Sequence, residues 1–493
     1  MRRAALAAAL LCSLGPAAGA AAALPDGRGW EMVSPVDKNG GQVEPPGPAP
    51  GGALTQASPG GDAVTYSSAA SFGEDPQGAP PLSQYVARRS GAGWSSENVS
   101  PPLLSGAYEG NPYLAFSTDL SRALLVNPSR CPEGEPCPAG YRLKELASGA
   151  LTASPPDPGE FEGASPGLDH VVFLKGEDLH RWSPPASGLT MLNSSPAAAL
   201  AGEGAVSAGG SRVYWLGADG NLYLRDGGAT KQVDAAAGGG GAFAAASADG
   251  SLAFFLAAGH LWRYEAASDS AAELTPGGVG AVLGASADGS RLFYLAGSRL
   301  HRWRPGGGST QLSSTEISGA HPASSSVSAD GRRLLFTTTA PLVLGDTNND
   351  PDAYQWQEQG SGSCTRSAGC LELISSGRAE DGAALAAASA DGNDAFFLTA
   401  RSLVGADPGS VDLYDARVGG GFPEPPPPIP CTGDSCQPLP SEPVDPTLTT
   451  LLAGLGNPRV RYRGSFRNCR TLARAGKRLA RAARGGPPPP PPP

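Results

Sequence analysis

The residues best suited to binding chemistry form a short run rich in oxygen-bearing side chains, Gly345-Asp346-Thr347-Asn348-Asn349-Asp350-Pro351-Asp352. Its alternating members are Asp346, Asn348, Asp350 and Asp352. Alternation of carboxylate and amide oxygens is how a calcium loop presents its ligands, although the glycine and terminal glutamate of an EF-hand are missing. The run therefore has two interpretations, a calcium site or an Asx-rich turn that caps its own backbone. Calcium is the one cofactor that the sequence suggests.

Three close pairs of cysteines indicate disulfide chemistry. The pairs, spaced five or six residues apart, are Cys131 and Cys137, Cys364 and Cys370, and Cys431 and Cys436. In an oxidising compartment such pairs predict small loop-closing disulfides. A zinc site would need CxxC-type spacing with convergent partners, which the sequence lacks.

One serine matches a hydrolase signature. Gly163-Ala164-Ser165-Pro166-Gly167 fits G-x-S-x-G, but a nucleophile elbow needs a strand before it, a helix after it, and later Asp and His partners. Ser165 instead falls in a repeated hairpin turn, and an apolar strand over 171–174 follows. No P-loop or dinucleotide fingerprint occurs, so no catalytic centre is predicted.

The C-terminal segment 457–484 concentrates positive charge in a chain of formal net charge −10. Its ten basic residues, unaccompanied by acidic ones, are Arg459, Arg461, Arg463, Arg467, Arg470, Arg474, Lys477, Arg478, Arg481 and Arg484. We expect a solvated, disordered tail that is attracted to anionic envelope surfaces. Nucleic acid is a poor candidate partner for a secreted protein.

The elements that must position these residues come from one repeated unit. Four nearly identical Ser-Ala-Asp-Gly turns begin at Ser247, Ser286, Ser328 and Ser389, and looser copies begin at Ser58, Ser117, Ser165 and Ser207. Their shortest spacing is about 40 residues, the length of a four-stranded propeller blade. Each turn precedes a short apolar strand, and Asp-Gly suits such a turn because Asp caps it and Gly adopts positive φ.

These turns resemble the TolB-like, WD40-like (PD40) propeller repeat, whose core is an S-P/A-D-G turn before an apolar strand. The opening stretch Asp26-Gly27-Arg28-Gly29-Trp30-Glu31-Met32-Val33-Ser34-Pro35 is similar to that of secreted actinobacterial proteins that carry this repeat. The resemblance covers residues 24–420 and implies an all-β fold, a β-propeller. It implies no particular activity, because propellers host many.

We expect eight four-stranded blades, or seven if one degenerate early repeat is not a blade. The last repeat lacks its final strand, because Val411–Ala416 runs into Gly and Pro. Trp30–Pro35 has the pattern of that strand, so the N-terminus is predicted to complete the last blade and to remove its exposed edge. Long loops in repeats seven, eight, one and two would then be neighbours and form a binding rim.

The regions outside the repeats complete the domain organisation. Residues 1–23 are predicted to be a secretory signal peptide, since Arg2 and Arg3 precede an apolar run and a small-residue cleavage site. The propeller over 24–420, a Pro-rich linker over 421–456 and the basic tail over 457–493 follow. No other apolar run is long enough to span a bilayer.

Two functions are compatible with this organisation. The first is a secreted, non-catalytic binding or scaffold propeller at the cell envelope, whose partner is an extracellular protein, glycan or wall polymer. The alternative is a propeller enzyme, a lyase or glycosidase, with its site in the central funnel. That alternative needs carboxylates or histidines converging on one face.

Overall fold

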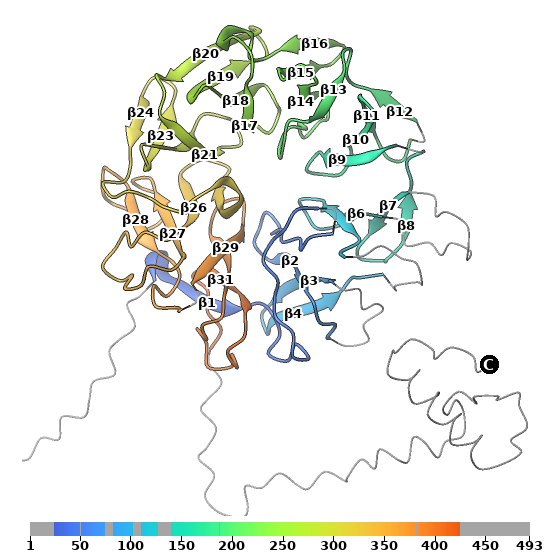
Figure 1. Ribbon diagram of the computed structural model, residues 1–493. Helices are drawn as coiled ribbons and strands as arrows, with labels where there is room; N and C mark the ends of the chain where they lie inside the picture. Colours follow the sequence, from blue (N-terminus) through green and yellow to red (C-terminus); the bar gives the residue numbers. More distant parts are fainter. Residues whose placement is uncertain are drawn as a thin grey trace, which may run out of the picture. The chain divides into compact units, whose positions relative to one another are not determined.

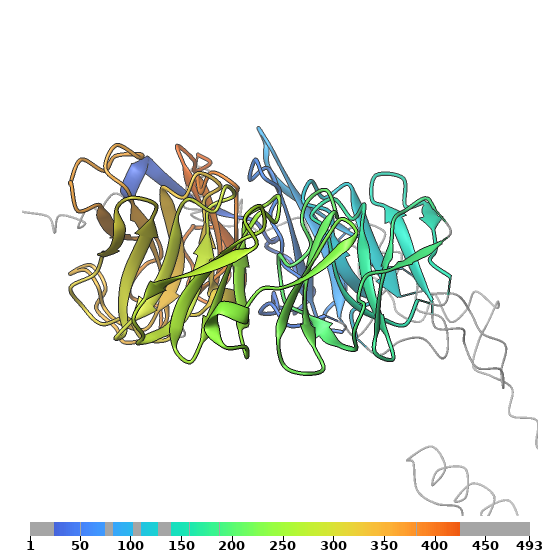
Figure 2. The same cartoon turned by 90° about the horizontal axis from the view of Figure 1, so that it is seen from above.

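The chain forms eight antiparallel sheets arranged as blades around a ring (Figure 1). The computed structural model describes residues 24–423 except 50, 74–81, 102–109, 127–139, 157, 187 and 381. Within these residues there are 31 strands and three short 3-10 helices, and no helix has the length and apolar character needed to cross a membrane. From the side the ring is a flattened disc (Figure 2). The predicted eight-bladed propeller is confirmed, and the seven-bladed alternative is wrong.

The blades follow one another in chain order. Blade 1 contains β2 (Ala63–Ser68), β3 (Ser83–Ser90) and β4 (Gly93–Asn98); blade 2 contains β5 (Tyr113–Phe116), β6 (Arg122–Val126), β7 (Tyr141–Glu145) and β8 (Leu151–Ala153); blade 3 contains β9 (Glu160–Ala164), β10 (Val171–Lys175), β11 (Asp178–Trp182) and β12 (Leu189–Met191); blade 4 contains β13 (Ala197–Leu200), β14 (Arg212–Gly217), β15 (Leu222–Asp226) and β16 (Ala229–Gln232). Blade 5 contains β17 (Ala242–Ala246), β18 (Leu252–Ala257), β19 (His260–Glu265) and β20 (Ser270–Thr275); blade 6 contains β21 (Val279–Ala285), β22 (Leu292–Ala296), β23 (Arg299–Arg304) and β24 (Gly308–Gln311); blade 7 contains β25 (Ser325–Val327), β26 (Arg333–Thr338), β27 (Asp352–Gln357) and β28 (Cys370–Leu373); blade 8 contains β29 (Ala383–Ala388), β30 (Asp394–Thr399), β31 (Asp412–Val418) and β1 (Arg28–Met32).

Blade 1 departs from the four-stranded pattern, since its sheet has three strands. The preceding segment forms no continuous strand beside β2 and pairs with it through isolated bridges, Val43 to Ser68 and Ala57 to Val64, and a few further hydrogen bonds such as that from the Thr65 N–H to the Gln56 carbonyl. Pro45, Pro46 and Pro48 explain the irregularity, because proline cannot donate a hydrogen bond to a strand ladder.

Each repeated turn is held by hydrogen bonds from its own serine and aspartate. In blade 5, Ser247 Oγ donates to Asp249 Oδ1 at 2.7 Å and accepts the Leu252 N–H at 3.0 Å. Asp249 Oδ1 also accepts the Ser251 N–H at 2.9 Å. Gly250 has φ +67°, in the left-handed region that favours glycine. The repeated residue types therefore follow from the geometry of the turn.

Neighbouring turns are also joined by a backbone ladder that runs from blade to blade. The second residue of one turn donates its N–H to the carbonyl of the second residue of the next, in the order Ala208, Ala248, Ala287, Ala329, Ala390 and Pro59, and again from Thr118 to Pro166, at 2.7–3.0 Å. Proline accepts such a bond but has no N–H to pass it on. The ladder is therefore interrupted after Pro59 of blade 1 and after Pro166 of blade 3.

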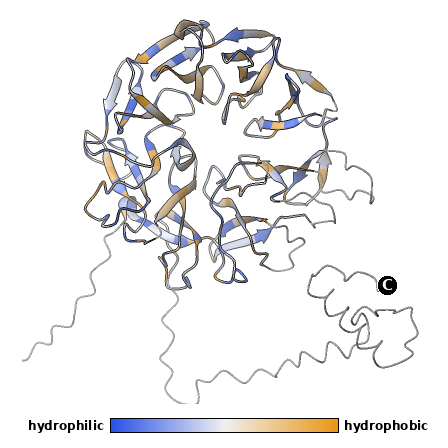
Figure 3. Cartoon of the chain, in the orientation of Figure 1, coloured by the Kyte–Doolittle hydropathy of each residue, from blue (hydrophilic) through white to orange (hydrophobic). Residues whose placement is uncertain are grey.

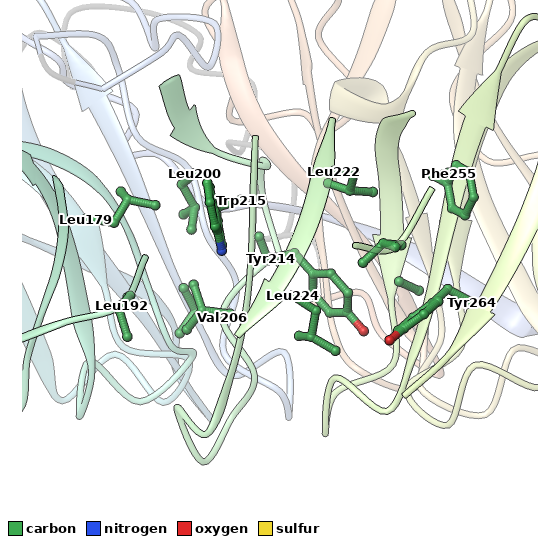
Figure 4. Close-up of a cluster of buried hydrophobic side chains, with 14 of the residues drawn as sticks. Leu179, Leu192, Leu200, Val206, Tyr214, Trp215, Leu222, Leu224, Phe255 and Tyr264 are labelled. Carbon is green, nitrogen blue, oxygen red and sulfur yellow. The ribbon is translucent and has the colours of Figure 1, made fainter. Parts of the chain in front are cut away.

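The core consists of apolar layers between adjacent blades. Around blade 4, Figure 4 shows Leu179 and Leu192 of blade 3 on one side of Trp215 and Phe255 of blade 5 on the other; all four are buried in one cluster. Hydrophobic residues recur in every blade around the ring (Figure 3). Each blade is thus stabilised by its two neighbours, as is usual for repeat architectures.

The N-terminal strand closes the ring, as predicted. β1 pairs antiparallel with β31, with Trp30 opposite Ala416 and Met32 opposite Tyr414. This pairing covers an edge of β31 that would otherwise be free to pair with another chain.

Candidate functional site

The ring contains a cavity of about 810 Å³ at the inner side of blades 1 to 4. Its walls come from the segment Leu54–Ala57 of blade 1 and from β5, β9 and β13. Each of these three strands is the first of its blade and an edge strand of its sheet, and β9 faces the inside of the ring (Figure 1). Four consecutive blades therefore build one preformed hollow.

The cavity wall is mainly apolar, with a few fixed polar groups. Its large apolar side chains are Leu54, Leu114, Phe116, Phe161, Leu168 and Leu200. Gln56 Nε2 donates to the Ser117 carbonyl at 2.9 Å, and Glu162 Oε2 accepts the Leu200 N–H at 2.9 Å. The buried Thr55 hydroxyl has no hydrogen-bond partner among the described residues. An apolar hollow of this size with a few oriented polar groups is typical of a ligand site.

The interrupted turn ladder lies at the same part of the ring. Thr118, Ser165 and Pro166 belong to the cavity lining, together with 202–206 of blade 4. Because Pro166 cannot donate to the turn at Ala208, blades 3 and 4 lack the direct turn-to-turn bond that joins blades 4 to 8. The interruption of the turn ladder at Pro166 thus lies in the cavity wall.

The Asp/Asn run of blade 7 adopts consecutive Asx turns. Asp346 Oδ1 accepts the Asn348 N–H at 3.3 Å, and Asn348 Oδ1 accepts the Asp350 N–H at 3.1 Å. The hydroxyl of Tyr354 donates to Asp346 Oδ2 at 2.5 Å. Among the residues that the structure describes, no three Asp, Glu, His or Cys side chains converge as metal ligands. The carboxylates of Asp346, Asp350 and Asp352 therefore do not form a three-carboxylate cluster in the described part of the chain, and the calcium site of Asp346, Asn348, Asp350 and Asp352 stays a prediction.

Asp352, at the start of β27, is the buried member of this run. Its side chain is inaccessible to solvent, and Oδ1 accepts the Ser375 hydroxyl at 2.5 Å and the Gly377 N–H at 3.2 Å. Oδ2 has no hydrogen-bond partner among the described residues. Burial raises the pKa of Asp352 to about 6 in spite of the Ser375 hydrogen bond, and the nearby Asp346 carboxylate adds to the rise.

A second buried carboxylate group lies where β1 closes the ring against blade 1. Glu31 accepts two hydrogen bonds from Arg89, each 2.7 Å, and one from Trp94 Nε1 at 2.9 Å. Asp415 lies opposite Glu31 in the sheet and is fully buried, and neither of its oxygens has a hydrogen-bond partner within the described part of the chain. Asp394, beside it on β30, pairs with Arg417.

These two environments shift the carboxyl groups in opposite directions. Burial raises the pKa of Asp415 well above its usual range, and the neighbouring Asp394 and Glu31 carboxylates raise it further. Burial opposes ionisation of Glu31 too, but its hydrogen bonds from Arg89, the Gly421 N–H and Trp94 lower the pKa of Glu31. Hydrogen bonds stabilise the ionised form of Glu31, whereas the ionised form of Asp415 receives no such stabilisation.

Ser165 lies in the turn between β9 and β10, as its repeat position predicts. Its hydroxyl accepts the His170 N–H at 3.1 Å, the same structural bond that Ser247 makes in blade 5. The strand-turn-strand context differs from the strand-turn-helix of a nucleophile elbow. The G-x-S-x-G match is therefore part of the repeat.

The predicted disulfide between Cys364 and Cys370 is present, with Cα atoms 5.6 Å apart. Cys131, Cys137, Cys431 and Cys436 lie outside the described residues, as do the signal segment 1–23, most of the linker and all the basic residues of the tail.

The cavity was not foreseen from the sequence, which pointed to the long loops of repeats seven to two. Phe116 and Phe161 are recognisable in the sequence only as apolar strand residues, and Phe116 also packs in a core cluster. The wall itself joins residues from Pro48 to Val206, and only the packing of neighbouring blades brings them together.

Comparisons with known proteins find similarity to solved structures alone. No family model matches the sequence, and no curated protein matches it either. Among solved structures, the chain is similar to Porphyromonas gingivalis dipeptidyl peptidase 4, with 10% identity and a TM-score of 0.47 over 73% of this chain and 59% of that one.

Two further structures are similar at comparable identity. A putative TolB from Agrobacterium tumefaciens shows 14% identity and a TM-score of 0.29, covering 54% of this chain and 90% of that one. The tricorn protease shows 13% identity and a TM-score of 0.29, covering 69% of this chain and 32% of that one. The chain thus spans about three fifths of the length of the dipeptidyl peptidase and a third of that of the tricorn protease.

Proposed function

We propose that this chain is a secreted, non-catalytic β-propeller of the PD40 type that binds a protein partner at the cell envelope. Its ligand site is the cavity of blades 1 to 4, and the ligand is a short, uncharged and partly apolar segment of that partner. The observation that carries this proposal is the preformed apolar wall shared by four blades.

The chemistry of the wall favours such a segment over the other partner classes. The titratable side chains in the lining are Glu162 and Glu203, so an anionic wall polymer would meet repulsion there. Phe116, Phe161 and Leu200 offer apolar contact, which suits aliphatic and aromatic side chains of a peptide. Gln56 and the Thr55 hydroxyl supply polar groups that a peptide backbone can use.

Two further observations support the location. The N-terminal segment has the composition of a secretory signal, and the Cys364–Cys370 disulfide fits an oxidising compartment. The opening stretch also resembles that of secreted actinobacterial propellers. A tail rich in arginine would add weak attraction to anionic envelope polymers or lipids.

Capture from cell-envelope extract tests the proposal. The wild-type chain and a Phe161→Ala variant are immobilised, and captured proteins are compared by quantitative mass spectrometry. Because Phe161 is half-buried in the cavity wall, its truncation removes ligand contact, and we expect capture of the specific partner to fall about tenfold, the effect of losing a moderate hot spot.

Met191→Ala is the matched control, since Met191 is 49% exposed on the outer strand of the same blade. It should capture as much partner as the wild type. Equal capture by the Phe161→Ala variant, with an unchanged melting temperature, would rule out the cavity as the binding site. If only glycan or wall fragments were captured, the ligand would be a glycan or wall polymer and not a segment of a protein.

The enzymatic alternative depends on the two lining glutamates, because glycosidases use a pair of carboxylates. We assign Glu162 a structural role instead, since its Oε2 accepts the backbone N–H of Leu200. Hydrolysis of envelope glycans by the wild type, abolished in Glu162→Gln or Glu203→Gln, would favour the enzyme.

A further inference from the structure

Blades 7 and 8 share one arrangement of hydrogen-bonded polar side chains in the connection between their second and third strands, which we call the polar frame. In blade 7 the Tyr354 hydroxyl accepts the Leu342 N–H at 3.1 Å and donates to Asp346. In blade 8 the Tyr414 hydroxyl accepts the Leu403 N–H at 3.2 Å and donates to Asp407. The two loops therefore share the same hydrogen bonds to the tyrosine hydroxyl, although the loop of blade 7 is one residue longer between the aspartate and the tyrosine.

The frame extends to a buried aspartate at the start of the third strand. Asp352 of blade 7 accepts the Ser375 hydroxyl at 2.5 Å, and Asp412 of blade 8 accepts the Ser34 hydroxyl at 2.5 Å. Ser34 follows the N-terminal strand β1, so ring closure supplies blade 8 with the serine that blade 7 obtains after β28. Both aspartates are fully buried.

The two blades differ in what neutralises this aspartate. In blade 8, Lys38 Nζ lies 2.6 Å from Asp412 Oδ1, and the side chains are 2% and 0% exposed. In blade 7 no described Lys, Arg or His forms an ion pair with Asp352, and its Oδ2 has no hydrogen-bond partner among those residues. A buried carboxylate of this kind is costly unless a cation accompanies it.

A second carboxylate, that of Asp346, lies close to Asp352. Gly377 donates its N–H to Asp352 Oδ1 at 3.2 Å and accepts the Thr347 N–H at 3.0 Å. A Cβ atom on Gly377 would lie 2.8 Å from the Asp346 Cα. Asp346 and Asp352 therefore flank the same glycine, and Asn348, whose Nδ2 donates to the Ala379 carbonyl at 2.9 Å, is packed against the same segment.

We propose that blade 7 binds one calcium ion beside the free Oδ2 of Asp352, where the ion neutralises this buried aspartate as Lys38 neutralises Asp412 in blade 8, with the carboxylates of Asp352 and Asp346 as its charged ligands. The amide oxygen of Asn348 and backbone carbonyls of the loop complete the set. Asp350 is not a ligand in this proposal.

Three features of the site favour calcium over other cations. Two carboxylates balance the charge of a divalent ion, and calcium accepts carboxylate, amide and carbonyl oxygens in irregular arrangements, whereas magnesium requires near-ideal octahedral geometry. A proton on Asp352 would neutralise one carboxylate only, whereas a divalent ion balances Asp352 and Asp346 together. The site is independent of the cavity ligand proposed above.

Calcium binding is tested on the full chain after treatment with a chelator. Calcium chloride is titrated by calorimetry, and thermal unfolding is followed with and without about 10 mM calcium. We expect one site per chain with a Kd of about 10⁻⁴ to 10⁻³ M, the range of extracellular modules, and a rise of a few degrees in melting temperature by mass action.

Variants identify the ligands. Asp352→Asn should abolish both the binding heat and the thermal shift, whereas Asp350→Asn and the cavity variant Phe161→Ala should retain them. If Asp352→Asn does not fold, Asn348→Ala provides the same comparison and should weaken binding about tenfold or more.

Other outcomes overturn the proposal. No binding heat and no thermal shift in the wild type would show that the frame is only a turn. A shift retained by Asp352→Asn would place the ion elsewhere, and an equal response to magnesium would remove the selectivity for calcium.

Discussion

Asp415 is an aspartate that the closed ring leaves without a partner. It lies between Glu31 and Phe396 in the sheet of blade 8, and Arg89 and Arg417 are already engaged by Glu31 and Asp394. An ionised carboxylate at this position would repel two neighbours of the same charge without gaining a hydrogen bond. The position therefore favours the protonated acid.

This predicts a pH-dependent contribution to stability. Because the pKa of Asp415 is raised on folding, the folded state holds the proton more tightly than the unfolded chain. The favourable contribution is complete below the unfolded pKa of about 3.9 and is lost as the pH rises through the folded value. Asp415→Asn removes the charge, so it should stabilise the ring at pH 8 by about 1–3 kcal/mol and have little effect near pH 4.

Denaturant unfolding at the two pH values measures this difference. Glu31→Gln is the matched control of opposite sign, because it leaves Arg89 without its carboxylate and should destabilise the ring at pH 8. If Asp415→Asn destabilised the ring equally at both pH values, the carboxyl would have a packing role only.

At the scale of the single element, the repeated turn is the unit of construction. Gly331 has φ +66°, and a Cβ atom there would lie 2.8 Å from Ser286 Cβ and Arg291 Cβ of the preceding blade. Two requirements thus act at once, the left-handed backbone and the close approach of the neighbouring blade.

A pair of glycine variants separates these requirements. Gly259 has φ +78° but nothing within 4 Å of a Cβ, so Gly259→Ala should cost only the backbone strain, about 1–2 kcal/mol. Gly331→Ala should cost a further 1–3 kcal/mol or so, because the neighbouring blade must shift. Equal losses in chemical denaturation would mean that the contact between blades is easily relieved.

The turn also explains how much of the fold was predictable. Seven of the eight repeat starts, from Ser117 to Ser389, lie in the turn before the second strand of a blade, and Ser58 lies in the turn before β2, the first strand of the three-stranded blade 1. Hydrogen bonding and φ favour Ser, Asp and Gly in this turn. Pro59 and Pro166 were recognised only as looser copies. Their effect, the interruption of the ladder, depends on which turn lies next in space.

At the scale of the whole molecule, closure decides what the ring can do. β1 joins residues nearly 390 positions apart, with Arg28 opposite Val418, and its continuation supplies Ser34 and Lys38 to the frame of blade 8. The pattern of Trp30–Pro35 was sufficient to predict the pairing. The consequences for Asp412 and Asp415 were not predictable, because they depend on contacts between opposite ends of the chain, and the cavity was not predictable because it depends on how four neighbouring blades pack.

The cavity is the feature of the whole ring that this account connects with function. Its wall takes Leu54 from blade 1, Phe116 from blade 2, Phe161 from blade 3 and Leu200 from blade 4. No single repeat contains the site, and a partner bound there would contact several blades together.

Site-specific photo-crosslinking tests this claim most directly. A photoreactive phenylalanine analogue replaces Phe161 in the cavity wall or, as a control, Met191 on the outer strand of the same blade. After irradiation in the native envelope, the account predicts a cross-linked protein partner from position 161 and none from position 191. Cross-linking from position 191 but not from position 161 would contradict it, because the partner would then bind the outer rim of the ring and leave the cavity empty.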